Sequence, residues 1–587
     1  MLLFICLCLP LYAFANNRNF TPADGYSPAR ELDAEFRAVV DSINFKIYDA
    51  FDGSRANSDM EAFYFDMGNR LHIESKTVTI KKRLLFKKGT EVNQELLIET
   101  ERRLRKEEFL ADAIIEVQRK KNGHANIRIT TFDQFSTIPA WNLQKPGDEW
   151  TWFLGPVESN LLGTGQKIAL IYGHEVDRNI YMLQYENKAF IWNSLELSGL
   201  AAKLSDGYKY EYSLKRPLLS KQQKWGMLLS GYGYKRDIYY YLDADKPGVA
   251  RKQKASASTG TTLLFFDKSD VGPALFLRYE DVVELNVSGS LTRSFGTKHK
   301  LNLSLTINWT DIYQESGTPF LINKSLQEHS QVSEDALHKF QLDNRTDFLS
   351  GIYFSYFQNQ YKTVKNFRNL KWSENLDVGF RIATGIAQNV PFLGAKNSSL
   401  YLRHLLAYVN AWKSRHFILT RLSTGYFLDY SGQLEDGTLA GVCEYQWRPS
   451  AKHASYFATQ WKHYFAREEA SQLVLGGEQG LNGYPNRFFA GQARLLIELE
   501  QRYFPNLEMG TVAPALAMFL NAGDAYAHYQ DFEALGLHYS AGFGLRLGAT
   551  RSVQQTVTHL NIAFPLDPKY RDILDTWKFT LLVKGSL

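Results

Sequence analysis

Side chains that could carry covalent chemistry occur in this sequence without the spacing that catalysis requires. The chain has no Gly-x-Ser-x-Gly segment for a nucleophilic serine and no His-Glu-x-x-His segment for a zinc hydrolase. Its 13 histidines include no pair at ligand spacing on a recognisable scaffold. Glu498 and Glu500 could form an acid–base pair, but alternation places such carboxylates on the polar face of every strand, so a structural role is the prediction for both. The sequence therefore predicts no catalytic residue, no cofactor and no metal site, and a protein that is not an enzyme.

Cysteine usage and the first residues of the chain indicate a protein that leaves the cytoplasm. Residues 1–15 are apolar and end in Ala13-Phe14-Ala15, a small-x-small sequence that predicts a cleaved signal peptide. The alternative is a buried N-terminal helix. Of three cysteines only Cys443 would remain after cleavage, which excludes an intramolecular disulfide framework and a thiolate zinc site.

The composition excludes a disordered chain and leaves two classes of folded protein. The 587 residues hold 67 Lys and Arg against 62 Asp and Glu, with 44% hydrophobic and 22% charged positions. After residue 15 no stretch of about 18 apolar residues follows, so no membrane-spanning helix is predicted. Mean hydropathy is −0.31, which fits a soluble protein and also a membrane barrel whose strands alternate. The aromatic fraction of 14% is high, as expected where rings line a core or both membrane interfaces.

The first 140 residues predict a polar leader over 16–60, with one short helix at Arg30–Ser42, and then a small α+β module over 61–140. Hydrophobic spacing switches within the module from period two to period 3.6 and back, and Asn122-Gly123 is a hairpin signal. The expected elements are a strand at Arg70–Arg83, a helix at Asn93–Ala113, and strands at Ile114–Arg119 and Ala125–Thr131.

From about Trp150 the pattern is one of long alternating strands. Apolar and polar residues alternate over Leu301–Thr310, Leu495–Tyr503 and Trp577–Val583, which places each set on opposite faces of a sheet. Runs of about ten residues are longer than ordinary sandwich strands and match a tilted strand that crosses a bilayer. At about 27 residues per strand and loop, residues 150–587 predict a closed antiparallel transmembrane barrel of about 16 strands, with 14 or 18 as alternatives.

A glycine-rich segment at 475–491 carries the most specific pattern. It reads Leu-Gly-Gly-Glu-Gln-Gly-Leu-Asn-Gly-Tyr-Pro-Asn-Arg-Phe-Phe-Ala-Gly and is followed by a strand that contains Glu500-Gln501-Arg502. With five other segments it resembles, in order, the BamA/TamA-type outer-membrane assembly superfamily, the bacterial surface antigen barrels with periplasmic POTRA domains. These segments are Phe86-Lys87-Lys88-Gly89 with Glu99 to Arg105, Asn160-Leu161-Leu162-Gly163-Thr164-Gly165, Met518 to Asp524, Ser540 to Arg546, and Ala563-Phe564-Pro565-Leu566.

The resemblance implies where the functional residues lie. The glycine-rich loop would enter the barrel lumen, and its glycines permit positive φ and close backbone approach. The implied loop motif is Gly476, Gly477, Gly480, Asn482, Gly483, Tyr484 and Gly491, and the implied barrel-wall partners are Glu498, Glu500, Arg502, Asn521 and Gly523. An implied seam between the first and last strands would include Gly163, Gly165, Trp577, Phe579 and Gly585.

The sequence departs from the family pattern at two positions. In the family an Arg of the loop meets an Asp of the wall, whereas Asn482 and Asn521 stand at those positions here. One hypothesis is an amide latch between the two asparagines, weaker than an ion pair and insensitive to salt. In the alternative they do not meet, and Arg487 or Arg494 supplies a cation to Glu498 or Glu500.

The function that the resemblance implies is insertion or export of polypeptide clients, or of lipid-linked clients, without covalent chemistry. The expected location is the outer membrane of a Gram-negative bacterium, with the POTRA-like module in the periplasm. Outer-membrane lipids, unfolded or exported polypeptides and a periplasmic protein are the implied partners; no nucleic acid is expected. The rival functions are a passive pore or uptake channel and a barrel-borne hydrolase.

Overall fold

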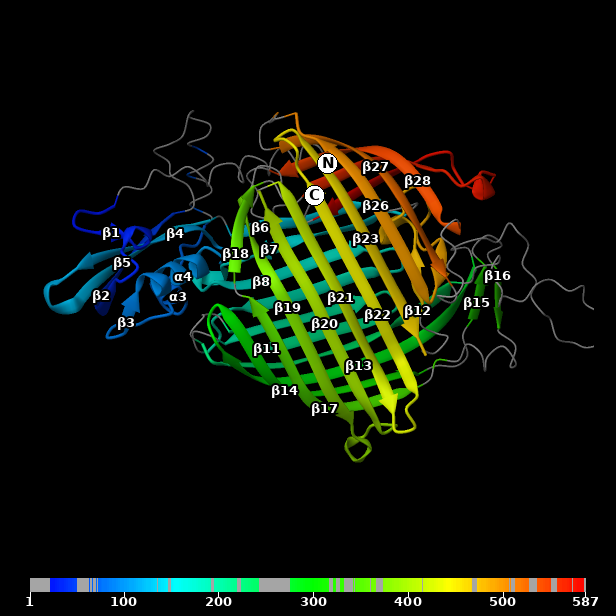
Figure 1. Cartoon of the computed structure of the whole chain (residues 1–587), viewed down its shortest axis with the longest axis horizontal. Helices are drawn as coiled ribbons and strands as arrows, with labels where there is room; N and C mark the ends of the chain where they lie inside the picture. Colours follow the sequence, from blue (N-terminus) through cyan, green and yellow to red (C-terminus); the bar gives the residue numbers. More distant parts are fainter. Residues whose placement is uncertain are drawn as a thin grey trace, which may run out of the picture.

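The chain forms a small mixed sheet at its N-terminal end and one large barrel, shown side by side in Figure 1. The computed structural model describes residues 22–49, 63, 66, 70, 72–134, 136–145, 149–191, 195–218, 223–241, 275–315, 320–323, 328–331, 342, 344–358, 360–365, 373–413, 415–466, 472–505, 507, 512–526, 536–549, 557–572 and 574–584. The predicted signal peptide lies outside the described residues. In the described parts of the chain, no helix has the length and hydropathy needed to span a bilayer.

The N-terminal module is a five-stranded sheet in the order β1-β4-β5-β2-β3, with two helices packed against it. Strand β2 runs parallel to β5, and β4 is antiparallel to β5. Leu97 and Leu104 of the helical side are fully buried against Ile127 and Ile129 of the sheet, which makes a closed apolar core. The elements are β1 (Ser27–Pro28), β2 (Arg37–Tyr48), α3 (Thr77–Lys81), β3 (Glu91–Asn93), α4 (Gln94–Leu104), β4 (Leu110–Arg119) and β5 (His124–Asp133).

Three predictions in this region are wrong: the helix at Arg30–Ser42, the polar leader over 16–60 and the strand at Arg70–Arg83. The expected leader helix at Arg30–Ser42 is a short 3-10 turn followed by strand β2, so the described part of the 16–60 leader belongs to the sheet. Alternating burial of Phe36, Ala38 and Val40 and β-branched residues favour the strand. The expected strand at Arg70–Arg83 contains helix α3 instead, since its alternation spans too few residues to fix a period.

The predicted start of the helix at Asn93 and the predicted hairpin at Asn122-Gly123 are confirmed. Helix α4 covers the first half of the expected Asn93–Ala113 helix, and the Asn93 side chain caps it by accepting from the Leu96 backbone N–H at 2.8 Å. The hairpin between β4 and β5 turns at Asn122 and Gly123, whose φ angles of 76° and 74° explain the Asn-Gly pair.

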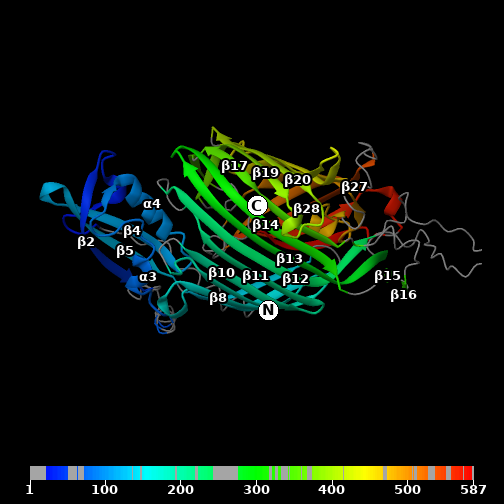
Figure 2. The ribbon, with the colours of Figure 1, turned by 90° about the horizontal axis from the view of Figure 1, so that it is seen from below.

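The second part is a closed antiparallel barrel (Figures 1 and 2). Within the described residues 20 strands form the ring, each hydrogen-bonded to its neighbours. They are β6 (Thr137–Gln144), β7 (Thr151–Glu158), β8 (Gln166–His174), β9 (Asn179–Asn187), β10 (Glu196–Leu204), β11 (Gly207–Arg216), β12 (Trp225–Tyr241), β13 (Leu275–Phe295), β14 (His299–Gln314), β17 (Arg345–Gln358), β19 (Ser373–Asn389), β20 (Ser399–Trp412), β21 (His416–Asp429), β22 (Leu434–Trp447), β23 (His453–Phe465), β26 (Ala493–Tyr503), β27 (Val512–Tyr526), β28 (His538–Ala549), β29 (Val557–Pro565) and β30 (Lys578–Lys584). Short strands β15 (Phe320–Asn323), β16 (Glu328–Gln331) and β18 (Gln360–Lys365) extend the wall.

The antiparallel barrel is confirmed, but its predicted size and first residue are wrong. The ring has 20 strands, not about 16, and it begins at Thr137, before residue 150. Strands β8 to β11 are only 9 or 10 residues long, and tight turns join β8 to β9 and β10 to β11. They therefore use less chain per strand than the average of about 27 residues that the prediction assumed.

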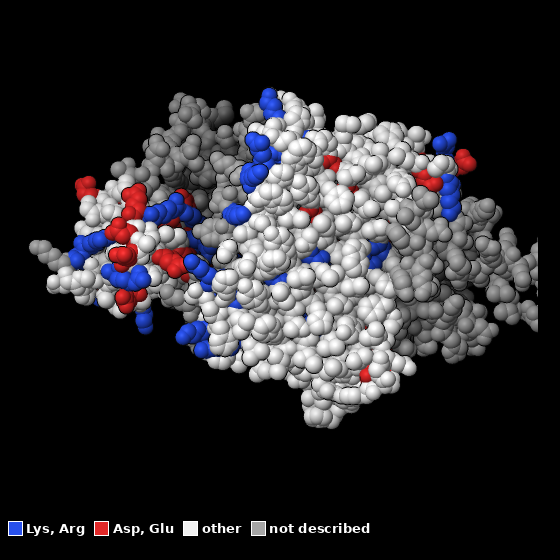
Figure 3. Space-filling model, in the orientation of Figure 1, with Lys and Arg blue, Asp and Glu red and all other residues white. Residues whose placement is uncertain are grey.

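An apolar belt covers the outside of the barrel. On β14, Leu305 and Ile307 are 59% and 52% exposed, whereas the alternate residue Ser304 faces the lumen and is 8% exposed. The belt continues through Leu170, Leu183, Leu229, Leu291, Ile352, Ile382, Ile386, Leu406, Leu422, Leu516, Met518, Phe543 and Ile562. Figure 3 shows few charged residues over the barrel face and many on the N-terminal module. An exposed apolar surface of this extent suits hydrocarbon and exceeds what soluble monomers carry.

The ring closes between its first and last strands. In the described residues β30 joins β6 through the pair Lys145–Leu581, with N–H···O distances of 2.8 and 3.2 Å. By contrast, β29 and β30 pair continuously from Val557 to Ala563. Among the described residues, this junction therefore has fewer hydrogen bonds than any other pair of neighbouring strands in the ring.

The predicted seam residues divide into three groups. Phe579 lies on β30 and Trp577 directly before it, and both are exposed on the outside. Gly163 and Gly165 lie in the turn between β7 and β8, where they contact the N-terminal module, so their assignment to the seam is wrong. Gly585 lies outside the described residues.

Candidate functional site: a strap across the barrel lumen

The glycine-rich segment between β23 and β26 folds inward as a strap, here residues 472–492. Its short strands β24 (Leu473–Leu475) and β25 (Phe489–Gly491) pair with each other. Gly476, Gly480 and Gly483 have φ angles of 118°, 95° and 97°, which side-chain-bearing residues rarely adopt. The glycine spacing noted in the sequence therefore serves the tight folding of the strap.

An aromatic cluster fixes one side of the strap. Tyr484 is fully buried, and its hydroxyl donates to the Tyr539 backbone oxygen at 3.2 Å. Phe489 stacks on His538 with ring centroids 4.2 Å apart, and Phe488 meets Phe489 edge-to-face at 4.9 Å. Burial, with the nearby Asp567 carboxylate, raises the pKa of Tyr484, so the phenol stays neutral and keeps its hydrogen bond.

The side chains of Arg487 and Gln472 reach from the strap across the lumen to strands far along the ring. Arg487 donates two hydrogen bonds to the Asp177 carboxylate, at 2.8 and 2.6 Å, and one to the Tyr241 hydroxyl. Asp177 lies in the turn between β8 and β9, and Tyr241 ends β12. The Gln472 side chain also bonds the Tyr241 backbone N–H and oxygen, at 2.9 and 2.6 Å. The strap thus connects β26 with the turn between β8 and β9 and with the end of β12, on the far side of the ring.

Glycines on both the strap and the wall allow the two to come into close contact. A Cβ added to Gly523 of β27 would lie 2.6 Å from the Leu495 backbone oxygen and 3.0 Å from the Leu475 side chain. A Cβ on Gly483 would lie 3.2 Å from the Pro565 nitrogen. The motif that contains Gly523 and the Ala563–Leu566 motif therefore meet the strap directly.

The amide latch between Asn482 and Asn521 is wrong. Asn521 is 2% exposed and its side-chain nitrogen has no hydrogen-bond partner in the described residues, while Asn482 is only half-buried. The alternative pairing is wrong as well, because Arg487 binds Asp177 and Arg494 donates to the Val474 backbone oxygen at 3.2 Å. The strap does carry a cation, but its partner is 310 residues away in the sequence.

A buried ionic network lies on the inner side of β26 and β28 to β30. Glu500 accepts from Arg502 at 2.7 Å and from Arg546 at 3.2 and 3.0 Å. Arg546 also donates to Asn561 at 2.6 Å, and Asn561 donates to Thr580 at 3.2 Å. Arg502 and Arg546 are 3% and 2% exposed. One carboxylate therefore balances two buried guanidinium groups and ties four strands together.

The network explains two of the motifs seen in the sequence. Glu500 and Arg502 were expected on the barrel wall, whereas Arg546 and Asn561 were not among the predicted site residues. A Cβ on Gly544 would clash with the Arg546 and Asn561 side chains, so this glycine leaves the space that Arg546 occupies. The Ser-x-Gly-x-Gly-x-Arg spacing was the signal that could have identified Arg546.

The turn between β7 and β8 fixes the N-terminal module to the barrel. The Gly163 backbone oxygen accepts from the Lys76 N–H at 2.9 Å and from the Thr79 hydroxyl at 2.8 Å. Arg83, which is 1% exposed, donates to the Gly165 oxygen at 3.0 Å and forms an ion pair with Glu107 at 2.9 Å. The position of the module thus depends on a buried arginine.

Replacing Arg83 by Met is expected to loosen this junction. The substitution leaves the Glu107 carboxylate, 7% exposed, without its counter-charge, at a cost of about 3–5 kcal/mol. Hydrogen exchange should increase in residues 76–83 and 160–165. In the control Arg119→Met, which removes an exposed pair with Asp33, exchange should change little. Unchanged exchange in the Arg83 variant would contradict the assignment.

Comparisons with known proteins give similar structures and no sequence match. No family model matches the chain, and no curated protein matches it. BamA from Haemophilus ducreyi lacking POTRA domains 1–3 is similar at 12% identity and a TM-score of 0.40, over 93% of this chain and 85% of that one. CdiB from Escherichia coli is similar at 11% identity and 0.41, over 93% and 76%. OccK5 (OpdH) from Pseudomonas aeruginosa is similar at 10% identity and 0.32, over 76% and 96%.

The described residues offer no alternative site of metal chemistry. Among them, no group of three or more His, Cys, Asp or Glu side chains is placed to hold a metal ion. The arrangement consists of a strap across the lumen, an ionic network on the inner side of β26 and β28 to β30, and a ring whose described closure has few hydrogen bonds.

Proposed function

We propose that the chain is an outer-membrane barrel of the BamA/TamA-type superfamily that inserts or exports polypeptide clients without covalent chemistry. The observation that carries this proposal is the strap, which crosses the lumen and is anchored by a buried aromatic cluster and by the Arg487–Asp177 ion pair. A passive pore has no need of an obstruction held by an ion pair. The apolar belt supports a place in the membrane, and the six sequence motifs support the superfamily.

The seam between β30 and β6 is the proposed exit for a client strand. Its closure depends on the pair Lys145–Leu581, so separating the two strands breaks few hydrogen bonds. A client strand that adds to either free edge would restore them. This supports lateral insertion, with the N-terminal module on the periplasmic side of the membrane.

The N-terminal module is proposed to receive an extended client on one edge only. On the β4 edge, the N–H groups of Ala113 and Ile115 already donate to the Asp112 and Glu101 carboxylates, at 2.7 and 3.0 Å. On the opposite edge, β3 pairs with Arg37–Val39 alone among the described residues. Val40 also bonds the Gly89–Thr90 turn, so the part of β2 beyond Val40 is the edge suited to β-augmentation.

Depletion of the protein, followed by proteomics of the outer membrane and of the secreted fraction, tests this function. We expect a specific set of barrel or exported proteins to fall, and wild-type protein to restore them. Deleting residues 472–492 should abolish that restoration. If the deletion only raises conductance and no client changes, the protein is a passive pore and the proposal is wrong.

A further inference from the structure

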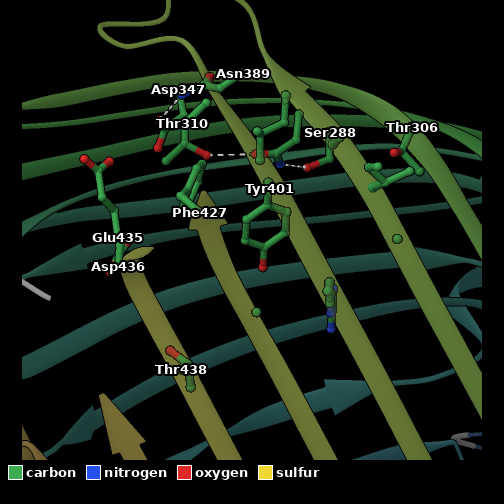
Figure 4. A pocket seen from close by; sticks show the side chains of 18 of the residues that line it. Ser288, Thr306, Thr310, Asp347, Asn389, Tyr401, Phe427, Glu435, Asp436 and Thr438 are labelled. Atoms are coloured by element: carbon green, nitrogen blue, oxygen red, sulfur yellow. Dashed lines mark hydrogen bonds between the residues drawn. The ribbon is translucent and has the colours of Figure 1, made fainter. Parts of the chain in front are cut away.

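The lumen holds a second feature that the strap does not use, a pocket of about 1210 Å³ on the wall formed by β13, β14, β17 and β19 to β22 (Figure 4). A cavity of this size accommodates a ligand of several rings. Its lining comes almost entirely from the barrel strands and includes no residue of the strap.

One side of the pocket is a ladder of neutral hydroxyl and amide groups. Asn308 donates to Ser288 at 2.6 Å and accepts from Thr310 at 3.0 Å, and Asn286 donates to Thr310 at 2.8 Å. Ser, Thr and Asn side chains both donate and accept, so the ladder matches a ligand whose own groups do both. Hydroxyl groups have this property.

The opposite side presents an aromatic face. The rings of Tyr401 and Phe427 lie 4.8 Å apart, and Figure 4 shows both among the residues that line the pocket. A Cβ on Gly425 would lie 2.6 Å from the Tyr401 hydroxyl oxygen, so this glycine lets the ring lie along the wall. A flat apolar face beside a polar ladder fits the C–H face and the hydroxyls of a sugar ring.

Two arginines supply positive charge to the same pocket. Arg403 and Arg421 are exposed in the lumen, and in the described part of the chain neither forms an ion pair or a hydrogen bond. Of the carboxylates in the lining, Asp347 and Asp436 are both paired with Arg345, and Glu435 lies at the end near the turn that joins β21 to β22. The free guanidinium groups are thus available for an anionic ligand.

We propose that this pocket binds an acidic oligosaccharide. One sugar unit packs on Tyr401, the hydroxyls of a neighbouring unit bond the Ser288–Asn308 ladder, and the carboxylate or phosphate groups of the chain meet Arg403 and Arg421. The site is separate from the strap and from the client function proposed above. The same chemistry is offered by a free polysaccharide and by the sugars of a lipid headgroup.

Calorimetry on the full-length protein in detergent tests the site with defined probes. The acidic probes are oligogalacturonate and lipopolysaccharide; the neutral glucose oligomer maltohexaose and polyglutamate are the comparisons. We expect at least one acidic saccharide to bind at least ~10-fold more tightly than either comparison. Binding of oligogalacturonate identifies a free polysaccharide as the source, and binding of lipopolysaccharide alone identifies a lipid headgroup.

Matched variants separate the pocket from the general charge of the lumen. Arg403→Gln and Arg421→Gln should each weaken binding of the acidic saccharide by ~10-fold. Arg381→Gln, which removes an exposed lumen arginine outside the pocket, should leave binding within twofold. Equal weakening by all three variants, equally tight binding of polyglutamate, or no binding of any acidic saccharide would overturn the proposal. Heat-modifiability on gels confirms that each variant barrel is folded.

Discussion

Replacing Glu500 by Gln is expected to lower the free energy of unfolding of the barrel by about 3–5 kcal/mol. The substitution keeps the shape of the side chain but removes the one carboxylate shared by Arg502 and Arg546. Both guanidinium groups are almost fully buried, so neither gains water in exchange. Urea-induced unfolding of the protein in lipid vesicles, followed by tryptophan fluorescence, measures the loss.

An exposed ion pair on a barrel strand provides the control for Glu500. Glu211 forms a salt bridge with Lys209 at 2.7 Å, and their side chains are 47% and 34% exposed. Glu211→Gln should therefore change the free energy of unfolding by less than about 1 kcal/mol. If the Glu500 and Glu211 variants lose the same free energy of unfolding, the buried network does not stabilise the barrel more than an exposed ion pair does.

The parts of the fold that follow from local spacing could be predicted from the sequence. Alternation over residues 301–310, 495–503 and 577–583 identified strands β14, β26 and β30, and Asn122-Gly123 identified a hairpin. Strand number was not predictable in this way, because it depends on how much chain each turn consumes. The same limit applies to β2, which has a short amphipathic pattern that either a helix or a strand can satisfy until the parallel β5 is in place.

The residues of the candidate site could likewise be predicted only where they lie close together in the sequence. The glycine spacing and the resemblance located the strap and the wall residues Glu500 and Arg502, which lie close together in the sequence. The partner of the strap could not be found, since Asp177 is 310 residues from Arg487 and no local pattern connects them. The cation of the strap is at position 487 and not at 482, and its anion lies in the turn between β8 and β9 and not at position 521 of β27. Because Asn482 and Asn521 are both neutral, neither position leaves an unpaired buried charge, and the strap is anchored by other residues.

Replacing Arg487 by Gln is expected to release the strap from the opposite wall, where Arg487 binds Asp177 and Tyr241. The change removes two charged hydrogen bonds to Asp177 and one bond to Tyr241, in a place where both charges are about four-fifths buried. A loss of about 3 kcal/mol corresponds to a roughly 100-fold larger population of the released strap. Single-channel recording in planar lipid bilayers should show this release as more frequent or longer high-conductance events.

A double-mutant cycle connects that effect to the ion pair. Asp177→Asn should open the channel to a similar degree, and the double variant should add little, because each single change already removes the charged contact. Arg381→Gln removes a lumen charge that does not contact the strap, so its conductance should follow the wild type apart from a small change in ion selectivity. Additive effects of the two clamp variants would mean that the arginine and the aspartate act separately. The strap would then be held mainly by its buried aromatic cluster, and the Arg487–Asp177 ion pair would have no part in gating the lumen.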